Sequence, residues 1–175
     1  MRMHNLRKEV QESCAYSLKV PECSLLEIRT AIVACCEQNA IPNSQELNGL
    51  QPIAFILIPG ARIHTQTPEQ RSSADIMHPP PECDYSLNFF DAVISNMPNV
   101  EDIIICTHSE CSYPVEMDFE KQLRLTSLCL KRSEQVWRQS VQVHVWHFEP
   151  EVNWVSFFDT DTRQMLPLNA AAIFA

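Results

Sequence analysis

Glycine is the scarcest feature of this sequence, because 175 residues contain only 2 glycines against 12 prolines. Chain reversals must therefore depend on proline, asparagine and serine. Glycine-rich loops that cradle phosphate groups are excluded by composition alone. The sequence thus argues against a nucleotide site built on such a loop.

Long apolar runs and clusters of basic residues are also lacking. No run approaches the roughly 20 apolar residues that a membrane-spanning helix needs. The chain has 13 basic and 22 acidic residues, for a net charge of -9, and no cluster of Lys and Arg could displace counterions from a phosphate backbone. We therefore expect no nucleic-acid partner and no insertion into a membrane.

A secretion signal is not expected either, although the chain contains eight cysteines. Residues 1–6 do not begin a signal peptide, so the cysteines are interpreted as reduced thiols in a reducing compartment, most simply the cytoplasm. A thiol-based sensor is an alternative use of these cysteines. It would require an exposed thiolate of low pKa.

The length and an apolar content of 45% favour a single domain over residues 1–175. Ser24 and Glu27 form a capping-box pattern, and the apolar residues that follow recur at helical spacing. We predict a helix over 24–39. The segment 5–20 predicts a second helix, so residues 1–40 are expected to form an N-terminal helical arm that packs against a partner subunit.

Residues 50–160 show alternating strand and helix patterns that predict an α/β core. The expected elements, in chain order, are a strand at 52–58, a long loop at 61–81 with at most a short strand at 74–77, a helix capped by Asp84 or Ser86 and ending near Met97, a strand at 102–106, a helix at 119–139 and strands at 141–146 and 152–158. This alternation predicts a mostly parallel sheet flanked by helices, with an antiparallel edge strand near the C-terminus.

Chemically active residues follow two of the predicted strands. His108 and Cys111 come directly after the strand at 102–106, and Arg62 follows the strand at 52–58. Ligands bind at the carboxyl ends of strands in such sheets, where an imidazole and a thiolate could hold one zinc ion. The plainer interpretation is that Cys111 packs as an apolar residue and that the His108 ring bonds to the backbone.

Four stretches, taken in order, resemble the β-class carbonic anhydrases: residues 53–62, 85–93, 101–111 and 141–148. The third is similar to that family's Gly-His-Ser-x-Cys-Gly segment. The resemblance implies a β-carbonic-anhydrase-like fold, pairing of subunits and a zinc ion held by two cysteines and one histidine. An Asp-Arg pair would orient the water that attacks carbon dioxide.

Mapped onto this chain, the resemblance places the histidine at His108, the second cysteine at Cys111 and the arginine at Arg62. The first cysteine falls on Ile58 and the aspartate on Gly60. Isoleucine has no lone pair to donate, and zinc catalysis needs about three protein ligands. The leading hypothesis is therefore a degenerate member that binds zinc poorly. It would serve as a non-catalytic subunit or interaction component in a homodimer or in a hetero-oligomer with a related subunit.

The alternative hypothesis is an active zinc carbonic anhydrase, or a related small-molecule hydrolase, with a rebuilt ligand set. Cys83, or a histidine of the loop at 61–81, would then replace the missing ligand. If the Asp-Arg pair is lost, Arg62 is a vestigial catalytic residue and forms a structural ion pair.

Two other kinds of site find little support in the sequence. The His-Ser-Glu segment at 108–110 is shared in part with zinc nucleoside deaminases, but no Pro-Cys-x-x-Cys follows it. A cysteine nucleophile with a histidine base, using Cys106 or Cys111, has no local signature.

Overall fold

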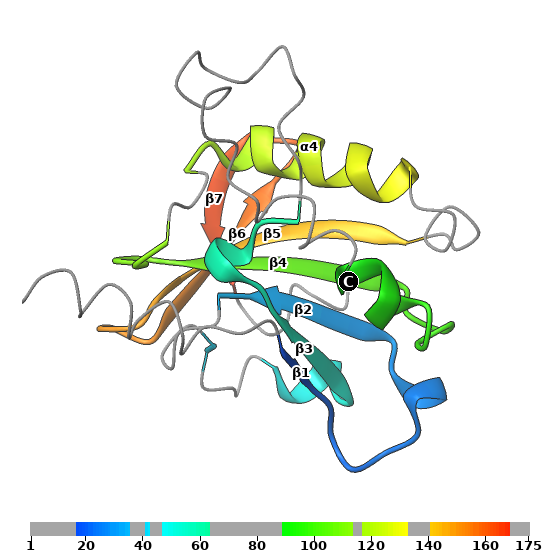
Figure 1. The fold of residues 1–175 in the computed structure, drawn as a ribbon. Helices are drawn as coiled ribbons and strands as arrows, with labels where there is room; N and C mark the ends of the chain where they lie inside the picture. Colours follow the sequence, from blue (N-terminus) through cyan, green and yellow to red (C-terminus); the bar gives the residue numbers. More distant parts are fainter. Residues whose placement is uncertain are drawn as a thin grey trace, which may run out of the picture.

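The described part of the chain forms one mixed β-sheet, with a long helix lying across one of its faces (Figure 1). The computed structural model describes residues 17–35, 41–42, 47–63, 89–113, 117–132 and 141–168. The sheet has seven strands in the order β1-β3-β2-β4-β5-β6-β7. Their bounds are Ser17–Lys19 (β1), Thr30–Ala34 (β2), Ile53–Leu57 (β3), Asp102–His108 (β4), Gln142–Glu149 (β5), Trp154–Asp159 (β6) and Gln164–Pro167 (β7).

The helical elements are short, apart from α4. Three 3-10 turns are Leu25–Glu27 (η1), Asn48–Leu50 (η2) and Pro59–Ala61 (η3), and α4 spans Phe119–Arg132. Residues 89–94 are also helical. No helix among the described residues is long and apolar enough to cross a membrane.

The four central strands are parallel and the edges are antiparallel. β2 pairs in parallel with both β3 and β4, and β4 pairs in parallel with β5. β6 and β7 then continue the sheet antiparallel, and β1 adds an antiparallel edge beside β3. The predicted fold class, with its antiparallel C-terminal edge, is confirmed. The strand β7 and the edge strand β1 were not predicted.

Side chains that alternate along the strands form two apolar layers, one on each face of the sheet. Ala31, Val33 and Ile105 face the layer that contains Phe90 and Leu130 of the helical segments. On the other face, Ile32, Ile104 and Trp146 pack with Leu47 and Phe148 (and further residues). Because both faces are covered, β2 is buried along its whole length.

The predicted helix at 24–39 is wrong for the residues that the structure describes. Ser24 does cap a turn, since its hydroxyl accepts a hydrogen bond from Leu26 N at 3.3 Å, but that turn is only η1. The chain then becomes extended as β2, because Thr30, Ile32 and Val33 favour a strand and a neighbour on each side supplies backbone partners. Of the expected N-terminal arm at 1–40, residues 17–19 also form a strand.

The other predicted elements agree with the structure where it describes them. β3, β4, β5 and β6 correspond to the four predicted strands of the core, and α4 and the helical turns at 89–94 to the two predicted helices. Of the predicted loop at 61–81, residues 64–81 with the expected strand at 74–77 lie outside the described residues, as do the caps Asp84 and Ser86 and residues 1–16.

Candidate metal centre

The carboxyl ends of β2 and β4 lie where the order of the strands reverses, and the region just beyond them is called the crevice here. The chain passes from β2 to β3 on one side and later to β4 on the other side. Open α/β sheets bind ligands at such a point, because the connections leave in opposite directions. Cys35 directly follows β2, His108 ends β4, and Cys111 lies in the turn after β4.

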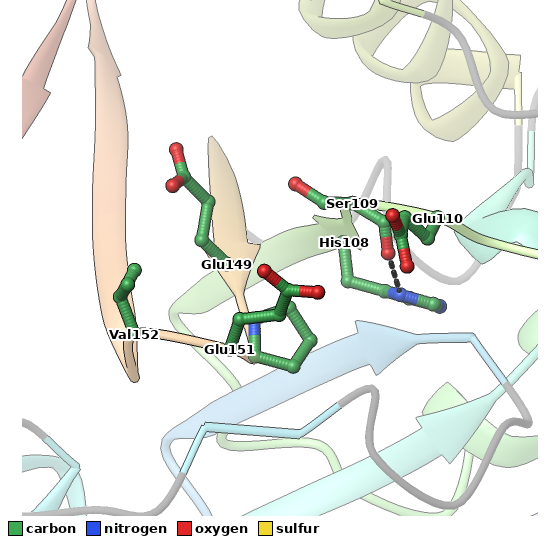
Figure 2. Close-up of a pocket in the computed structure, with 7 residues that line it drawn as sticks. His108, Ser109, Glu110, Glu149, Glu151 and Val152 are labelled. Carbon is green, nitrogen blue, oxygen red and sulfur yellow. Dashed lines mark hydrogen bonds between the residues drawn. The ribbon is translucent and has the colours of Figure 1, made fainter.

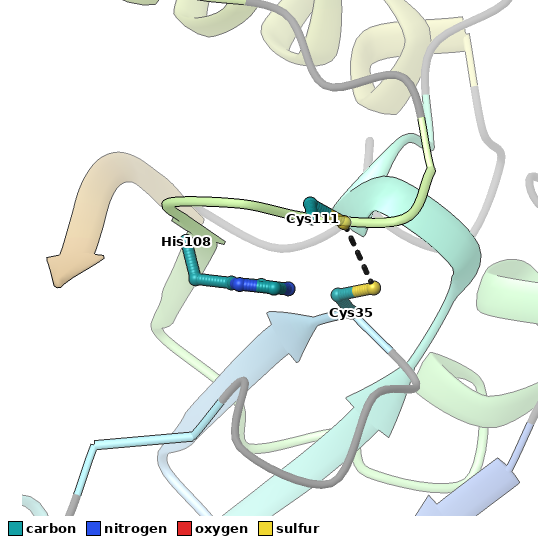
Figure 3. Close-up of side chains that lie close together, drawn as sticks. All are labelled: Cys35, His108 and Cys111. Carbon is teal, nitrogen blue, oxygen red and sulfur yellow. Dashed lines mark hydrogen bonds between the residues drawn. The ribbon is translucent and has the colours of Figure 1, made fainter. Parts of the chain in front are cut away.

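These three side chains come together in space. One ligand atom from each of Cys35, His108 and Cys111 lies within 4.8 Å of the other two. The two sulfur atoms are 3.3 Å apart, and neither cysteine forms a disulfide. Figure 3 shows the His108 ring and the side chain of Cys111 converging on Cys35. Cys35 is fully buried and His108 is 4% exposed, so water has little access to this group.

The orientation of His108 is set by its own turn. Its Nδ1 lies 2.7 Å from the carbonyl oxygen of Ser109. A carbonyl can only accept, so Nδ1 carries the hydrogen and donates it. In the neutral ring the lone pair is therefore on Nε2. A backbone acceptor on the second nitrogen is the usual arrangement of a histidine that ligates a metal.

The donor set fits a zinc ion. Zinc–sulfur bonds of about 2.3 Å, zinc–nitrogen bonds of about 2.0–2.1 Å and tetrahedral angles separate ligand atoms by roughly 3.5–3.8 Å. The measured spread of up to 4.8 Å, with the sulfurs at 3.3 Å, brackets this separation. Two thiolates and one imidazole are ligands that zinc prefers, and three protein ligands leave a fourth position open.

The cysteine that lies beside His108 and Cys111 is Cys35, which follows β2, whereas the predicted position of the first cysteine, Ile58, follows β3. Ile58 is 1% exposed and belongs to the apolar layer under the helices. Gly60 has φ 65°, a left-handed conformation that glycine adopts without steric cost. The segment at 58–62 is thus a tight turn. The second thiol beside His108, in addition to that of Cys111, belongs to Cys35.

Of the remaining predicted site residues, the structure describes Arg62 but not Cys83 or the loop histidines. Arg62 follows η3, which packs against β2 and β4, and its Nε is buried without a hydrogen-bond partner. No ion pair joins Arg62 to another described residue, so the structural ion pair expected of it is not found in this part of the chain. Cys83 and the histidines of the loop at 61–81 lie outside the described residues.

Cys106, by contrast, is a core thiol. It is fully buried in the apolar layer with Trp146, and burial raises the pKa of its thiol to about 12. The thiol therefore stays protonated at neutral pH, and Cys106 is not part of the group formed by Cys35, His108 and Cys111. The cysteines of this chain thus fall into at least two chemical groups.

Cys35 was missed because its segment also fits a helix. Residues 25–36 carry apolar side chains at helical spacing, but Ala31 to Ala34 are also an unbroken apolar run. A run of this length suits a strand covered on both faces and cannot be assigned by periodicity alone. The signal that could have found the ligand is a cysteine directly after such a run.

No family model and no curated protein sequence matches this chain. Among solved structures, the β-carbonic anhydrase CcaA superposes with a TM-score of 0.51 at 11% identity, covering 94% of this chain and 90% of that one. The chain has the β-carbonic anhydrase fold. A carbonic anhydrase from Streptococcus mutans superposes with a TM-score of 0.47 at 12% identity, covering 90% of this chain and 95% of that one. At such identities the likeness concerns the fold alone.

Proposed function

We propose that this β-carbonic-anhydrase-like chain binds one zinc ion through Cys35, His108 and Cys111 and hydrates carbon dioxide or hydrolyses a related small electrophile. The convergence of the three ligand atoms within 4.8 Å carries this proposal. The fold supports it, since the three side chains lie at the carboxyl ends of parallel strands, where open α/β sheets bind ligands.

The side chains of the crevice have distinct parts in this proposal. Cys35 and Cys111 supply two negative charges as thiolates, and His108 supplies a neutral donor that is held by its bond to Ser109 O. Zinc bound by three protein ligands supplies a Lewis acid that brings the pKa of a water molecule toward 7. Arg62 is the proposed cation at this edge of the sheet, where it would hold an anionic product.

A second candidate function is a zinc-holding subunit without catalysis. In the family resemblance, an aspartate stands two residues and an arginine four residues after the first cysteine. With Cys35 as that cysteine, the sequence has Glu37 and Asn39 instead. Glutamate retains a carboxylate but asparagine has no positive charge, so the Asp-Arg pair is incomplete. In this version the chain acts in a homodimer or beside a related, active subunit.

Zinc analysis of the natively purified full chain tests the metal site. We expect about one equivalent of zinc per chain, and a loss of most of it in Cys35→Ser. Cys23→Ser is the matched control, because Cys23 is a free, half-buried cysteine outside the crevice. Less than about a tenth of an equivalent in the native chain, or an unchanged content in Cys35→Ser, would contradict the proposed site.

Stopped-flow measurement of carbon dioxide hydration separates the two candidate functions. Zinc-dependent hydration that is lost in Cys35→Ser supports the enzyme. A full equivalent of zinc with no hydration above the buffer rate supports the non-catalytic subunit. Sedimentation of the same samples gives the oligomeric state, and a monomer at micromolar concentration would contradict the proposed homodimer.

A further inference from the structure

A second polar group lies at the same end of the sheet and consists of Thr107, Ser109 and His147. Thr107 of β4 pairs with His147 of β5 in the parallel register. The Thr107 hydroxyl lies 3.2 Å from the carbonyl oxygen of Trp146 and 2.9 Å from His147 Nδ1. Ser109 Oγ lies 3.1 Å from His147 Nε2. The three side chains thus form one continuous chain of hydrogen bonds.

The donor and acceptor of each of these hydrogen bonds follow from the carbonyl group at one end of the series. The carbonyl of Trp146 can only accept, so Thr107 donates its hydroxyl hydrogen there. The Thr107 oxygen then accepts from His147, which places the ring hydrogen on Nδ1. His147 Nε2 is left as an acceptor, and the hydroxyl of Ser109 donates to it. This is the arrangement of a serine nucleophile with a histidine base that a third group orients.

The surroundings keep the imidazole of His147 neutral and fixed. The side chain is 8% exposed, and the Phe119 ring of α4 lies against it with ring centroids 5.4 Å apart. Burial lowers the pKa of His147 most, the charge of Glu149 opposes this effect, and His108 adds to it. Glu149 is therefore close enough to stabilise the ring when it takes up a proton.

Ser109 borders a pocket of about 320 Å³, whose lining also includes Glu149 and Glu151. Figure 2 shows the Ser109 side chain and the His108 ring pointing in different directions from neighbouring positions. Ser109 is half-buried, so its hydroxyl can meet a molecule in the pocket. The Ser109 hydroxyl thus points away from the His108 ring, although both residues line this pocket.

We propose that Ser109 is a nucleophile and His147 its general base in the hydrolysis of small esters that carry a positive charge. The proposal rests on the hydrogen-bond chain and on the pocket. It does not depend on zinc.

The reaction balances with the groups present and one water molecule. Ser109 Oγ attacks the ester carbonyl as its proton moves to His147 Nε2, and His147 returns that proton to the departing alcohol. Water then attacks the acyl-serine while His147 accepts its proton. The carboxylic acid leaves, Ser109 recovers its hydrogen from His147, and no oxidant or reductant is required.

The charge of the pocket selects the substrate class. Glu110, Glu149 and Glu151 contribute three carboxylates to its lining, and none of the residues that line it is a lysine or an arginine. A cleft lined by charges of one sign concentrates ligands of the opposite sign, and these three glutamates are exposed to solvent. Esters with a quaternary ammonium group are thus favoured, and esters with a free carboxylate are repelled.

Two p-nitrophenyl esters with the same leaving group test the proposal on the full chain. We expect the p-nitrophenyl ester of 4-(trimethylammonio)butyrate to have a kcat/KM at least about tenfold above that of p-nitrophenyl hydrogen glutarate. A fluorophosphonate probe should label the native chain, and peptide mass spectrometry should locate the label on Ser109.

Substitutions then assign the roles. Ser109→Ala and His147→Gln should each lower kcat/KM by about 10³-fold or more. His144→Gln is the matched histidine control, since His144 bonds to Asp102 at the opposite end of the strands, and Ser95→Ala is the matched serine control. Both controls should retain the native rate and the label.

Thr107 is assigned as a positioning residue for His147. Thr107→Val keeps the shape of the side chain but removes the oxygen that holds Nδ1, so kcat should fall with KM unchanged. Thr107→Ser restores the oxygen and should recover the rate. A purely structural role would give the same result for both variants.

Three results would overturn the assignment: a label on another residue, native hydrolysis by Ser109→Ala, or loss of ester hydrolysis in Cys35→Ser. The last result would move the activity to the metal centre. Because Cys35→Ser should lose zinc and keep ester hydrolysis, failure of this proposal and failure of the proposed zinc function are separable. Equal rates for the two esters would overturn the substrate class.

Discussion

His108 and His147 lie at the carboxyl ends of neighbouring parallel strands, and the two rings have the same tautomer. Each donates from Nδ1, His108 to a backbone carbonyl and His147 to the Thr107 hydroxyl. Their Nε2 atoms differ in what they meet. That of His108 is turned toward two sulfurs and that of His147 toward the Ser109 hydroxyl. The comparison teaches that the partner of Nε2, more than the ring itself, separates the proposed metal ligand His108 from the proposed base His147.

The largest expected effect is that substitution of His108 and substitution of His147 each abolish a different property, zinc binding in the first case and labelling of Ser109 in the second. His108→Gln should weaken zinc binding by more than about 100-fold, because even outer partners of a zinc ligand are worth 10–100-fold. It should leave the labelling of Ser109 intact. His147→Gln should abolish the labelling and leave zinc bound. Zinc titration and probe labelling of both variants measure this, and loss of both properties in either variant would break the comparison.

Ile58 offers a test of which strand end supplies the metal ligand. Ile58→Ala should lower the free energy of unfolding by about 2–5 kcal/mol, because the side chain is buried in the apolar layer under the helices. The zinc content of the folded variant should stay at the native value. Denaturant unfolding and metal analysis provide the measurement, with Ile58→Val as a milder variant that should cost about 0.5–1.5 kcal/mol.

Cys106 and Cys23 test the distinction between a fully buried thiol and a half-buried one. With a thiol pKa of about 12 and no exposure, it should react with iodoacetamide at pH 8 at least about 100-fold more slowly than half-buried Cys23. Mass spectrometry of labelled peptides gives the two rates. Comparable rates for both cysteines would show that the strand opens far more often than its burial implies.

The smallest expected effect concerns pH. The folded pKa of His147 is below its ordinary value near 6.5. As the pH falls below that value, the unfolded chain binds a proton that the folded chain does not, so stability decreases. The decrease ends once the pH passes below the folded pKa. His147→Gln should remove this part of the pH dependence in thermal unfolding between pH 7 and 5, and an unchanged pH dependence would contradict the lowered pKa.

The sequence predicted those elements whose local pattern and tertiary setting agree. Alternation in β5, the buried run of β4 and the apolar stripe of α4 are each sustained over a whole element. β2 was mistaken because its local spacing favours a helix, whereas its backbone partners β3 and β4 are distant in the chain. Pairing with two strands overrides a local preference of this kind.

The candidate site was predictable only in part, for a related reason. His108 and Cys111 are close in sequence and follow a clear strand, so they could be found together. Cys35 is 76 residues from Cys111, and His147 is 38 residues from Ser109. Only the register of the sheet brings such residues into contact, and no local pattern encodes that register.

The full burial of Cys35 at the end of a central strand has a kinetic consequence for metal exchange. If zinc is bound as proposed, a chelator would reach an ion held by this buried sulfur only after part of the surrounding chain has moved aside. Release should therefore proceed at the rate of that opening and become independent of chelator concentration once chelator is in excess. An ion held in this way would persist through long dialysis even if its equilibrium affinity were ordinary.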